Sequence, residues 1–193
     1  MKLPKKQIYA LCDYQTLEKF DISLQRFIEI CEQYNTVYIQ YRDKQNTLQV
    51  QQQNIQFLKQ NTNIPIIIND KLELLEYADG LHLGQEDIQE QFNGKVNKIN
   101  TIKMIRKKYP HKIIGLSTHN ELEILEANNL DLDYIGLGAY RSTNTKDVSN
   151  ILGDNISYLA QISNHPVGAI GGVKLDDDIA NITYNVIGSG LLN

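Results

Sequence analysis

The feature that most constrains the fold of this chain is a repeated alternation between short β-rich runs and segments with helical periodicity. The eight candidate strands are residues 8–12, 36–41, 64–68, 80–83, 112–116, 134–137, 166–170 and 185–187. The helical segments between them are residues 22–33, 48–59, 72–77, 100–108, 121–127 and 148–162. Alternating strands and helices predict an α/β fold with a parallel sheet, and eight such repeats close into a (β/α)8 barrel, the TIM barrel.

The end of the sequence departs from a full barrel. A seventh helix near residues 176–181 is only weakly marked, and the sequence stops at Asn193, directly after the eighth strand. Barrels of this kind usually run to about 250 residues, so we expect a compact barrel without its last outer helix. A partner subunit in a homo-oligomer or an extra N-terminal element could cover the exposed flank, and the sequence leaves both open.

The composition indicates a single domain over residues 1–193, because 41% hydrophobic residues suffice for one core and no break divides the chain. A net charge of -4 argues against a nucleic-acid surface, while local Arg and Lys clusters could still bind a phosphorylated small molecule. Cys12 and Cys31 fit neither a CxxC pair nor a disulfide framework, which indicates buried thiols in the reducing cytoplasm. No run reaches the length of a membrane span or of a signal-peptide core.

Two carboxylates that follow neighbouring strands suggest a magnesium site. Asp70 follows Asn69 at the end of the third strand, and Asp87 comes shortly after the fourth. Taken alone, either Asp is more simply the cap of the following helix. Both stand, however, at the strand ends where such barrels place their active sites. One or two carboxylates that leave other positions to substrate phosphates suit Mg²⁺.

Two basic residues end the second strand. A period of two puts Gln40, Arg42 and Lys44 on one face, while Ile39 and Tyr41 face the other. Arg42 offers a planar fork and Lys44 a point charge, so the pair could clamp a diphosphate. A solvated strand end explains the same pair without any ligand.

Polar residues also surround the fourth and fifth strands. Ser117, Thr118 and His119 follow the fifth strand and could bind a heterocycle or transfer a proton. The simpler interpretation is that Asn120 or Ser117 caps the next helix. His82, inside the fourth strand, is equally well explained as a core histidine with satisfied hydrogen bonds.

The last three strands are followed by loops that suit an anion. These loops contain hydroxyls and a lysine after the sixth strand, and glycines after the seventh and eighth, where this fold commonly binds phosphate through exposed backbone N–H groups. The residues are Thr143, Thr145 and Lys146, then Gly171 and Gly172, then Gly188, Ser189 and Gly190.

As a set, these motifs resemble the thiamine phosphate synthase family, to which the thiazole tautomerases are related. The matching segments are QYRDK, INDKLEL, ADGLHLGQEDI, IIGLSTHN, DYIGLGAYRSTNTK and AIGGV, which follow the family's order over almost the whole chain. The resemblance implies that 4-amino-5-hydroxymethyl-2-methylpyrimidine diphosphate is joined to hydroxyethylthiazole phosphate, giving thiamine phosphate and pyrophosphate. Such a diphosphate should depart dissociatively, so charge stabilisation and alignment would carry the reaction without a covalent nucleophile.

The resemblance also implies a role for each candidate residue. Asp70 and Asp87 would hold Mg²⁺, and Gln40 would orient the pyrimidine together with Ser117. The diphosphate would be contacted by Arg42, Lys44, Asn69 and Lys146, and the thiazole phosphate by Thr143, Thr145, Gly172, Gly188 and Ser189. We therefore expect Arg42, Lys44, Lys146 and Ser117 to be the catalytic residues.

The chain departs from the family pattern at a few positions. Ala139 and Arg141 stand where the sixth loop usually has Pro and Phe, so we expect an altered wall around the thiazole. Tyr41 replaces a usual Leu on the outward face, where we expect packing effects only. The short segment 174–185 and the missing final helix put the support of the Ser189 loop in question.

Two alternatives to the synthase stay open at this point. A thiazole tautomerase would use a proton-transferring residue such as His119 and would not need paired acids for a metal. A noncatalytic binder of a phosphorylated precursor would fit the shortened C-terminus. The presence of Asn69, Asp70 and Asp87 together with the TNTK loop favours the synthase.

Overall fold

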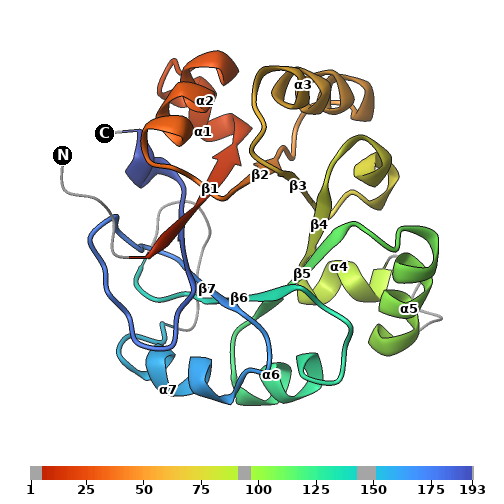
Figure 1. Ribbon diagram of the computed structural model, residues 1–193, viewed down its shortest axis with the longest axis vertical. Helices are drawn as coiled ribbons and strands as arrows, with labels where there is room; N and C mark the ends of the chain where they lie inside the picture. Colours follow the sequence, from red (N-terminus) through yellow and green to blue (C-terminus); the bar gives the residue numbers. More distant parts are fainter. Residues whose placement is uncertain (1–5, 91–96, 143–150, 193) are drawn as a thin grey trace.

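A computed structural model describes residues 6–90, 97–142 and 151–192 of the chain, and it has eight parallel strands closed into a barrel (Figure 1). The strands are β1 (Gln7–Asp13), β2 (Tyr38–Arg42), β3 (Ile66–Asn69), β4 (Gly80–Leu83), β5 (Ile113–Thr118), β6 (Tyr134–Gly138), β7 (Val167–Ile170) and β8 (Tyr184–Ile187). Each strand pairs with the next in sequence, and β8 pairs with β1, so the sheet has no free edge. The predicted (β/α)8 barrel is confirmed.

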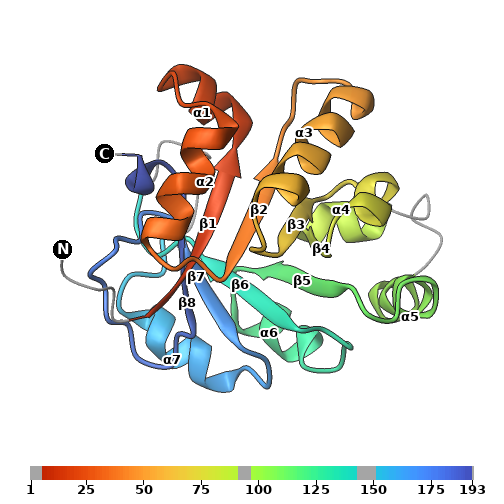
Figure 2. The ribbon, with the colours of Figure 1, turned by 45° about the horizontal axis from the view of Figure 1, so that its top comes forward.

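Helices and short 3-10 turns surround the strands (Figure 2). They are α1 (Tyr14–Lys19), α2 (Leu24–Gln33), α3 (Leu48–Asn61), η1 (Leu72–Tyr77), α4 (Gln85–Glu90), α5 (Lys98–Lys108), α6 (Glu121–Ala127), α7 (Asn155–Ile162) and η2 (Ser189–Leu191). The predicted helices 22–33, 48–59, 100–108 and 121–127 are confirmed with small shifts at their ends, whereas segment 72–77 is a 3-10 helix. None of the helices in the described ranges is long and apolar enough to cross a membrane.

Capping side chains set where several helices begin. The Ser23 hydroxyl accepts a hydrogen bond from the Arg26 N–H at 3.1 Å, so α2 begins at Leu24, later than its apolar pattern predicts. Asn120 caps α6 in the same way, because its Oδ1 accepts from the Glu123 N–H at 3.0 Å. The prediction that Asn120 caps this helix is therefore confirmed.

The segment between β7 and β8 corrects one prediction. The expected helix near residues 176–181 does not form, and the described residues 174–183 have no helical assignment. The Asp177 carboxylate instead accepts from the Lys174 N–H at 2.8 Å, and the Asn185 side-chain amide donates to the Asp177 carbonyl at 2.9 Å. These local side-chain bonds compete with helical backbone bonds.

The other C-terminal elements are shorter than the sequence pattern suggests. Helix α7 begins at Asn155 rather than at 148, and residues 148–150 lie outside the described ranges. Gly153, with φ +52°, has a left-handed backbone just before the helix, which a helix extending through it would not permit. After β8 the described residues form only η2.

The barrel interior is filled largely by tyrosines. Tyr9 and Tyr134 are almost fully buried there with Ile67 and Val186, separately from the apolar layer between sheet and helices. The rings of Tyr9 and Tyr134 meet edge to face with centroids 5.6 Å apart. Because a buried phenol requires a hydrogen-bond partner, this interior is polar as well as packed.

Candidate active site

The carboxyl ends of all eight strands lie at one rim of the barrel, since every pairing is parallel. The strand register pairs Asp13 with Arg42 and Asn69 with His82. The candidate residues that follow different strands are therefore gathered at the same opening, which is where this fold places its sites.

Asp70 and Asp87 are brought together at this rim. The Gly84 N–H donates to Asp70 Oδ1 at 3.1 Å, and a Cβ on Gly84 would lie only 2.4 Å from Asp87 Oδ2 and 3.8 Å from Asp70 Oδ1. Burial, and next to it the negative charge of Asp87, raise the pKa of Asp70 to about 6. The glycine thus leaves room for two acids whose mutual repulsion favours a cation between them.

The donor set fits a hard cation that keeps other ligands. No group of three or more acidic, histidine or cysteine side chains suited to a metal occurs within the described ranges. Two carboxylates suit Mg²⁺, which retains water or phosphate oxygens at its other positions. Asn69 donates from its side-chain amide to Asp70 Oδ2, so it orients this acid at the rim.

Lys44 and Arg42 stand at the same opening. The positive charge of Lys44 acts to lower the pKa of Asp70, against the larger effects of burial and of Asp87, which raise it. The Arg42 guanidinium forms an ion pair with Asp13, whose other oxygen caps α1 by accepting from the Thr16 N–H at 3.0 Å. The sequence analysis did not identify Asp13, although it ends β1 directly opposite Arg42.

Asp43 anchors the loop that carries these two cations. Its carboxylate accepts from the Gln15 side-chain amide at 2.8 Å, from the Tyr41 hydroxyl at 2.9 Å and from the Asn46 N–H at 3.1 Å. Although burial opposes ionisation, these bonds, chiefly from Asn46, hold the pKa of Asp43 below its ordinary value. The expectation that Tyr41 affects packing alone was therefore wrong.

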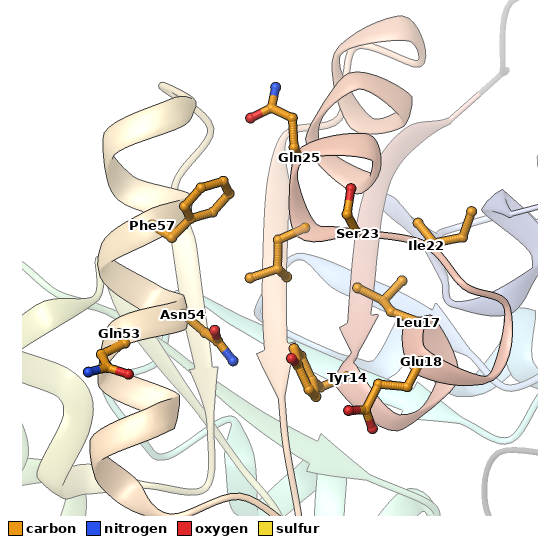
Figure 3. Close-up of a pocket in the computed structure, with 10 residues that line it drawn as sticks. Tyr14, Leu17, Glu18, Ile22, Ser23, Gln25, Gln53, Asn54 and Phe57 are labelled. Atoms are coloured by element: carbon orange, nitrogen blue, oxygen red, sulfur yellow. The ribbon is translucent and has the colours of Figure 1, made fainter.

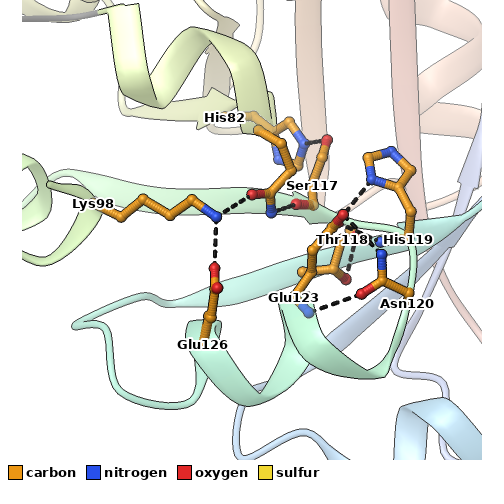
Figure 4. A network of polar contacts seen from close by, with 10 residues as sticks. His82, Lys98, Ser117, Thr118, His119, Asn120, Glu123 and Glu126 are labelled. Carbon is orange, nitrogen blue, oxygen red and sulfur yellow. Dashed lines mark hydrogen bonds and ion pairs between the residues drawn. The ribbon is translucent and has the colours of Figure 1, made fainter. Parts of the chain in front are cut away.

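Ser117 is held through both its side chain and its main chain (Figure 4). Its hydroxyl lies 2.9 Å from His82 Nε2, and its carbonyl accepts from the Gln85 side-chain amide at 2.6 Å. Lys98 donates to Gln85 Oε1 at 2.7 Å and pairs with Glu126 at 2.6 Å. These contacts fix Ser117 at the rim, where the sequence analysis expects it.

The two histidines near Ser117 serve different purposes. His82 is buried, and the loss of hydration lowers its pKa to about 4, so the ring is neutral. Its other nitrogen, Nδ1, lies 2.9 Å from the Tyr134 hydroxyl, which confirms the interpretation of His82 as a satisfied core histidine. His119 pairs through Nδ1 with Glu123 at 2.9 Å, and the Thr118 hydroxyl donates to the Gly136 carbonyl at 3.0 Å.

Gln40 lies inside the barrel rather than at its outer surface. It is buried, and its side-chain amide Nε2 donates to the Tyr9 hydroxyl at 2.8 Å. The Tyr9 hydroxyl in turn lies 2.7 Å from that of Tyr134. A continuous series of hydrogen bonds, the interior relay, therefore joins Gln40 to Ser117 through Tyr9, Tyr134 and His82. The sequence analysis missed both tyrosines, although each occupies an inward-facing strand position.

Glycines follow the last two strands, β7 and β8, at the rim. Gly171 and Gly172, after β7, have left-handed backbones with φ +86° and +64°, and Gly188 precedes Ser189 at the start of η2. A Cβ on Gly171 would lie 2.6 Å from the Ala139 Cβ, so a side chain is excluded there. Three further predicted site residues, Thr143, Thr145 and Lys146, lie outside the described residues.

Arg141 ties the late loops together. Its guanidinium forms a two-point ion pair with Asp177 at 2.6 and 2.9 Å, donates to the Gly172 carbonyl at 2.9 Å and covers the Tyr140 ring at 4.2 Å. The arginine that departs from the family pattern thus supports the short segment that replaces a helix.

Replacing Arg141 by Ala should lower the free energy of unfolding by about 1 kcal/mol at pH 7, a value reduced for its partial exposure. The Arg141 guanidinium lowers the pKa of Asp177, so the pair stabilises the fold above the ordinary pKa of aspartate. This contribution is lost as the pH falls through the lowered pKa, and the difference between variant and wild type should shrink with it. Urea unfolding at several pH values measures the effect.

The control for this prediction is Arg26→Ala. Arg26 pairs at 2.9 Å with Glu29 on the exposed face of α2, so its removal should cost about 0.5 kcal/mol or less. Equal losses for the two variants would contradict the supporting role of Arg141.

A cavity of about 490 Å³ lies outside the barrel and is distinct from this rim (Figure 3). Residues of α1, α2 and α3 line it, among them Tyr14, Leu17 and Phe57. None of the candidate site residues contributes to its lining. The cavity and the candidate site are therefore separate features of the molecule.

The closed parallel barrel, with acids, cations and glycine turns at its carboxyl rim, has the form of a TIM-barrel protein that handles phosphorylated small molecules. The model of one protein family, described as thiamine monophosphate synthase, matches residues 8–188. The chain belongs to this family.

Individual relatives agree with the family match. The thiamine-phosphate synthase of Picrophilus torridus is 30% identical over 80% of this chain and 73% of its own length. That of Persephonella marina is 31% identical over 86% and 77%. The solved thiamine phosphate pyrophosphorylase from Pyrococcus furiosus superposes with a TM-score of 0.74 at 21% identity, covering 96% of this chain and 87% of that one. This last likeness shows the common fold.

Proposed function

We propose that this protein is a thiamine-phosphate synthase, a transferase that joins an aminopyrimidine carried on a diphosphate to a thiazole phosphate. The observation that carries the proposal is the acid pair, Asp70 and Asp87, beside Lys44 and Arg42 at the rim of a barrel of this family. An acid pair next to two cations is suited to hold a metal and the diphosphate bound to it.

The reaction balances without an added proton acceptor. The bond between the pyrimidine methylene carbon and the diphosphate oxygen breaks, and its electron pair leaves with the diphosphate. The lone pair of the thiazole nitrogen then forms the new carbon–nitrogen bond, giving a thiazolium product and pyrophosphate. No proton must be removed, which agrees with a His119 engaged by Glu123 and a His82 inside the interior relay.

The chain's own residues would stabilise the leaving group. Asp70 and Asp87 hold Mg²⁺, which when bound neutralises charge on the departing diphosphate. Arg42 and Lys44 add positive charge, with Lys146 from outside the described residues as a further cation. Asp13 and Asp43 keep Arg42 and its loop oriented before substrate arrives, so little reorganisation is needed during the reaction.

Different residues of the rim would bind the two organic groups. Gln40 and Ser117 orient the pyrimidine. Asn69 contacts the diphosphate, and the thiazole phosphate is bound by the later loops, with Gly172, Gly188 and Ser189 in the described part and Thr143 and Thr145 outside it. Their combined task is to align the thiazole nitrogen with the carbon that loses the diphosphate.

The test is a coupled assay with purified protein, both substrates and Mg²⁺. Pyrophosphate and thiamine phosphate should appear in equal amounts. Metal-independent isomerisation of a carboxylated thiazole phosphate, abolished by His119→Ala, would instead identify a tautomerase. A rise in melting temperature with the thiazole phosphate but no conversion of either kind would identify a noncatalytic binder.

We also propose that the protein works in the cytoplasm. Cys12 and Cys31 are both free and buried, which suits a reducing compartment. A homo-oligomer stays a prediction, which the mass of the protein in solution would check.

A further inference from the structure

The donor and the acceptor in each hydrogen bond of the interior relay can be assigned by counting the donors and acceptors that each group offers. The Gln40 amide donates to Tyr9, so the Tyr9 oxygen is already an acceptor and its own O–H must donate elsewhere. Among the described residues, its other polar contact is the Tyr134 hydroxyl at 2.7 Å. Because Tyr9 is fully buried, an O–H without an acceptor would be costly, and Tyr9 therefore donates to Tyr134.

The hydrogen bonds between Tyr134, His82 and Ser117, nearer the rim, can be oriented in the same way. Tyr134 accepts from Tyr9, so its O–H donates to His82 Nδ1 at 2.9 Å. A neutral imidazole that accepts at Nδ1 carries its proton on Nε2, and Nε2–H therefore donates to the Ser117 oxygen at 2.9 Å. Ser117 is then left with its own O–H to donate. At the opposite end, the Gln40 oxygen Oε1 accepts from no described residue.

Neighbouring glycines make room for this arrangement. A Cβ on Gly115 would lie 2.1 Å from the Tyr134 ring carbon Cζ, and one on Gly136 would lie 3.1 Å from His82 Cε1. Both glycines have ordinary strand conformations, so their backbones do not require glycine. Their small size serves the packing of the two relay rings.

We propose that the interior relay is a specificity device: Tyr9, Tyr134 and His82 are positioning residues that make Gln40 an acceptor and Ser117 a donor toward the pyrimidine. This inference rests on the proposed function and extends it. An exocyclic amino group on the pyrimidine donates to Gln40 Oε1, and a ring nitrogen accepts from the Ser117 hydroxyl. A 4-oxo pyrimidine would place an oxygen against Gln40 Oε1 and is rejected.

The reversed relay would have the opposite preference. If the Gln40 amide were turned over, Tyr9 would donate to it, His82 would carry its proton on Nδ1, and Ser117 would donate inward to His82 Nε2. The site would then offer an amide donor where the pyrimidine has its exocyclic group and would suit an oxo group. The tautomer of His82 therefore shows in which direction the hydrogen bonds of the relay donate, and so whether Gln40 offers an acceptor or a donor to the pyrimidine.

The first measurement is the ¹⁵N spectrum of histidine-labelled protein, with the His82 signals assigned by their loss in His82→Asn. The wild type should show His82 protonated on Nε2 alone, and Tyr134→Phe should remove this bias. A proton on Nδ1 in the wild type would overturn the proposal. This readout needs no turnover, so it is decided separately from the coupled assay for the proposed function.

The second measurement is binding of 4-amino-5-hydroxymethyl-2-methylpyrimidine and of its 4-oxo analogue to wild type and variants. The wild type should prefer the amino compound, and Tyr134→Phe should reduce that preference about tenfold, the loss of one oriented hydrogen bond. Tyr9→Phe breaks the relay at another point and replaces Tyr134→Phe if the latter does not fold. In the coupled assay, either variant should raise KM for the pyrimidine diphosphate more than it lowers kcat.

The matched control is Tyr38→Phe. Tyr38 packs in the same cluster, with its ring centroid 5.4 Å from that of Tyr9 and 5.6 Å from that of Tyr184, but its hydroxyl takes part in none of the hydrogen bonds that form the relay. This variant should keep the amino preference and the His82 tautomer. An equal loss of preference in Tyr38→Phe and Tyr134→Phe, or binding of neither pyrimidine by the wild type, would refute the relay as a specificity device.

Discussion

Changing Asp70 or Asp87 to Asn is expected to lower Mg²⁺-dependent pyrophosphate release about 100-fold or more. Asn keeps the size of the side chain, and at position 70 it can still accept the Gly84 N–H at Oδ1, but either change removes a negative charge from the acid pair. The site would then hold the cation and its diphosphate poorly. Steady-state kinetics over a range of Mg²⁺ concentrations measures the loss, which excess metal should only partly restore.

The same Asp70→Asn change should stabilise the metal-free protein at pH 7. Burial and the charge of Asp87 raise the pKa of Asp70, so ionised Asp70 is disfavoured in the fold relative to the unfolded chain. An amide avoids this cost, and the melting temperature should rise while activity falls. Opposite changes in stability and activity are typical of residues kept for function rather than for folding.

Glu86→Gln is the control for the acid pair. Glu86 is exposed on α4, next to Asp87 in sequence, and removal of its charge should leave pyrophosphate release within about threefold of wild type, as for other surface substitutions. Asp87→Asn with similarly small losses would contradict a metal site at this rim.

The position of the candidate site at the rim can be predicted from the sequence because it depends only on the order and direction of the strands. Runs of β-branched and apolar residues locate the strands, and β4 has the expected bounds, Gly80–Leu83. Once the strands alternate with helices, they must be parallel, and their carboxyl ends must share one side. Asp70 and Asp87 are therefore brought together by the fold class alone, without knowledge of any single contact.

The partners of these residues could not be found in the same way. Asp13 caps α1 in the structure, and only the register of β1 with β2 shows that it also lies opposite Arg42, with which it pairs. Tyr9 and Tyr134 count as apolar residues in a strand pattern, which hides their hydroxyls. The alternation of inward and outward side chains that selects Gln40 on β2 would, applied to β1 and β6, also point Tyr9 and Tyr134 inward. Their hydrogen-bond partners lie on other strands, which the alternation within one strand does not show.

Arg141 illustrates a different limit. Its departure from the family pattern is visible in the sequence and suggests only an altered wall around the thiazole. The structure shows that Asp177, 36 residues later, pairs with it and that the intervening glycine turn accepts from it. The weak helical pattern at 176–181 is overridden because this side-chain network occupies the groups that a helix would use.

Gly115→Ala tests the packing on which the interior relay depends, and we expect it to destabilise the protein by about 1–3 kcal/mol. The added Cβ would lie 2.1 Å from Tyr134 Cζ and 2.5 Å from its hydroxyl oxygen, so the ring would have to move inside a closed barrel. The backbone would by itself favour Ala over Gly by about 0.5–1 kcal/mol, so any loss of stability reports the clash. Urea unfolding measures the change.

Gly136→Ala provides the comparison on the next strand, β6, where Gly136 pairs with Ser117, two residues nearer the rim than Gly115. Its Cβ would lie 3.1 Å from His82 Cε1, a distance that a small shift of the ring relieves, so the loss should be clearly smaller than for Gly115→Ala. The His82 tautomer should be disturbed in Gly115→Ala, because displacing Tyr134 interrupts the relay between Tyr9 and His82. A Gly115→Ala protein as stable as the wild type, with an unchanged tautomer, would mean that Tyr134 does not occupy the interior position from which it can orient Ser117.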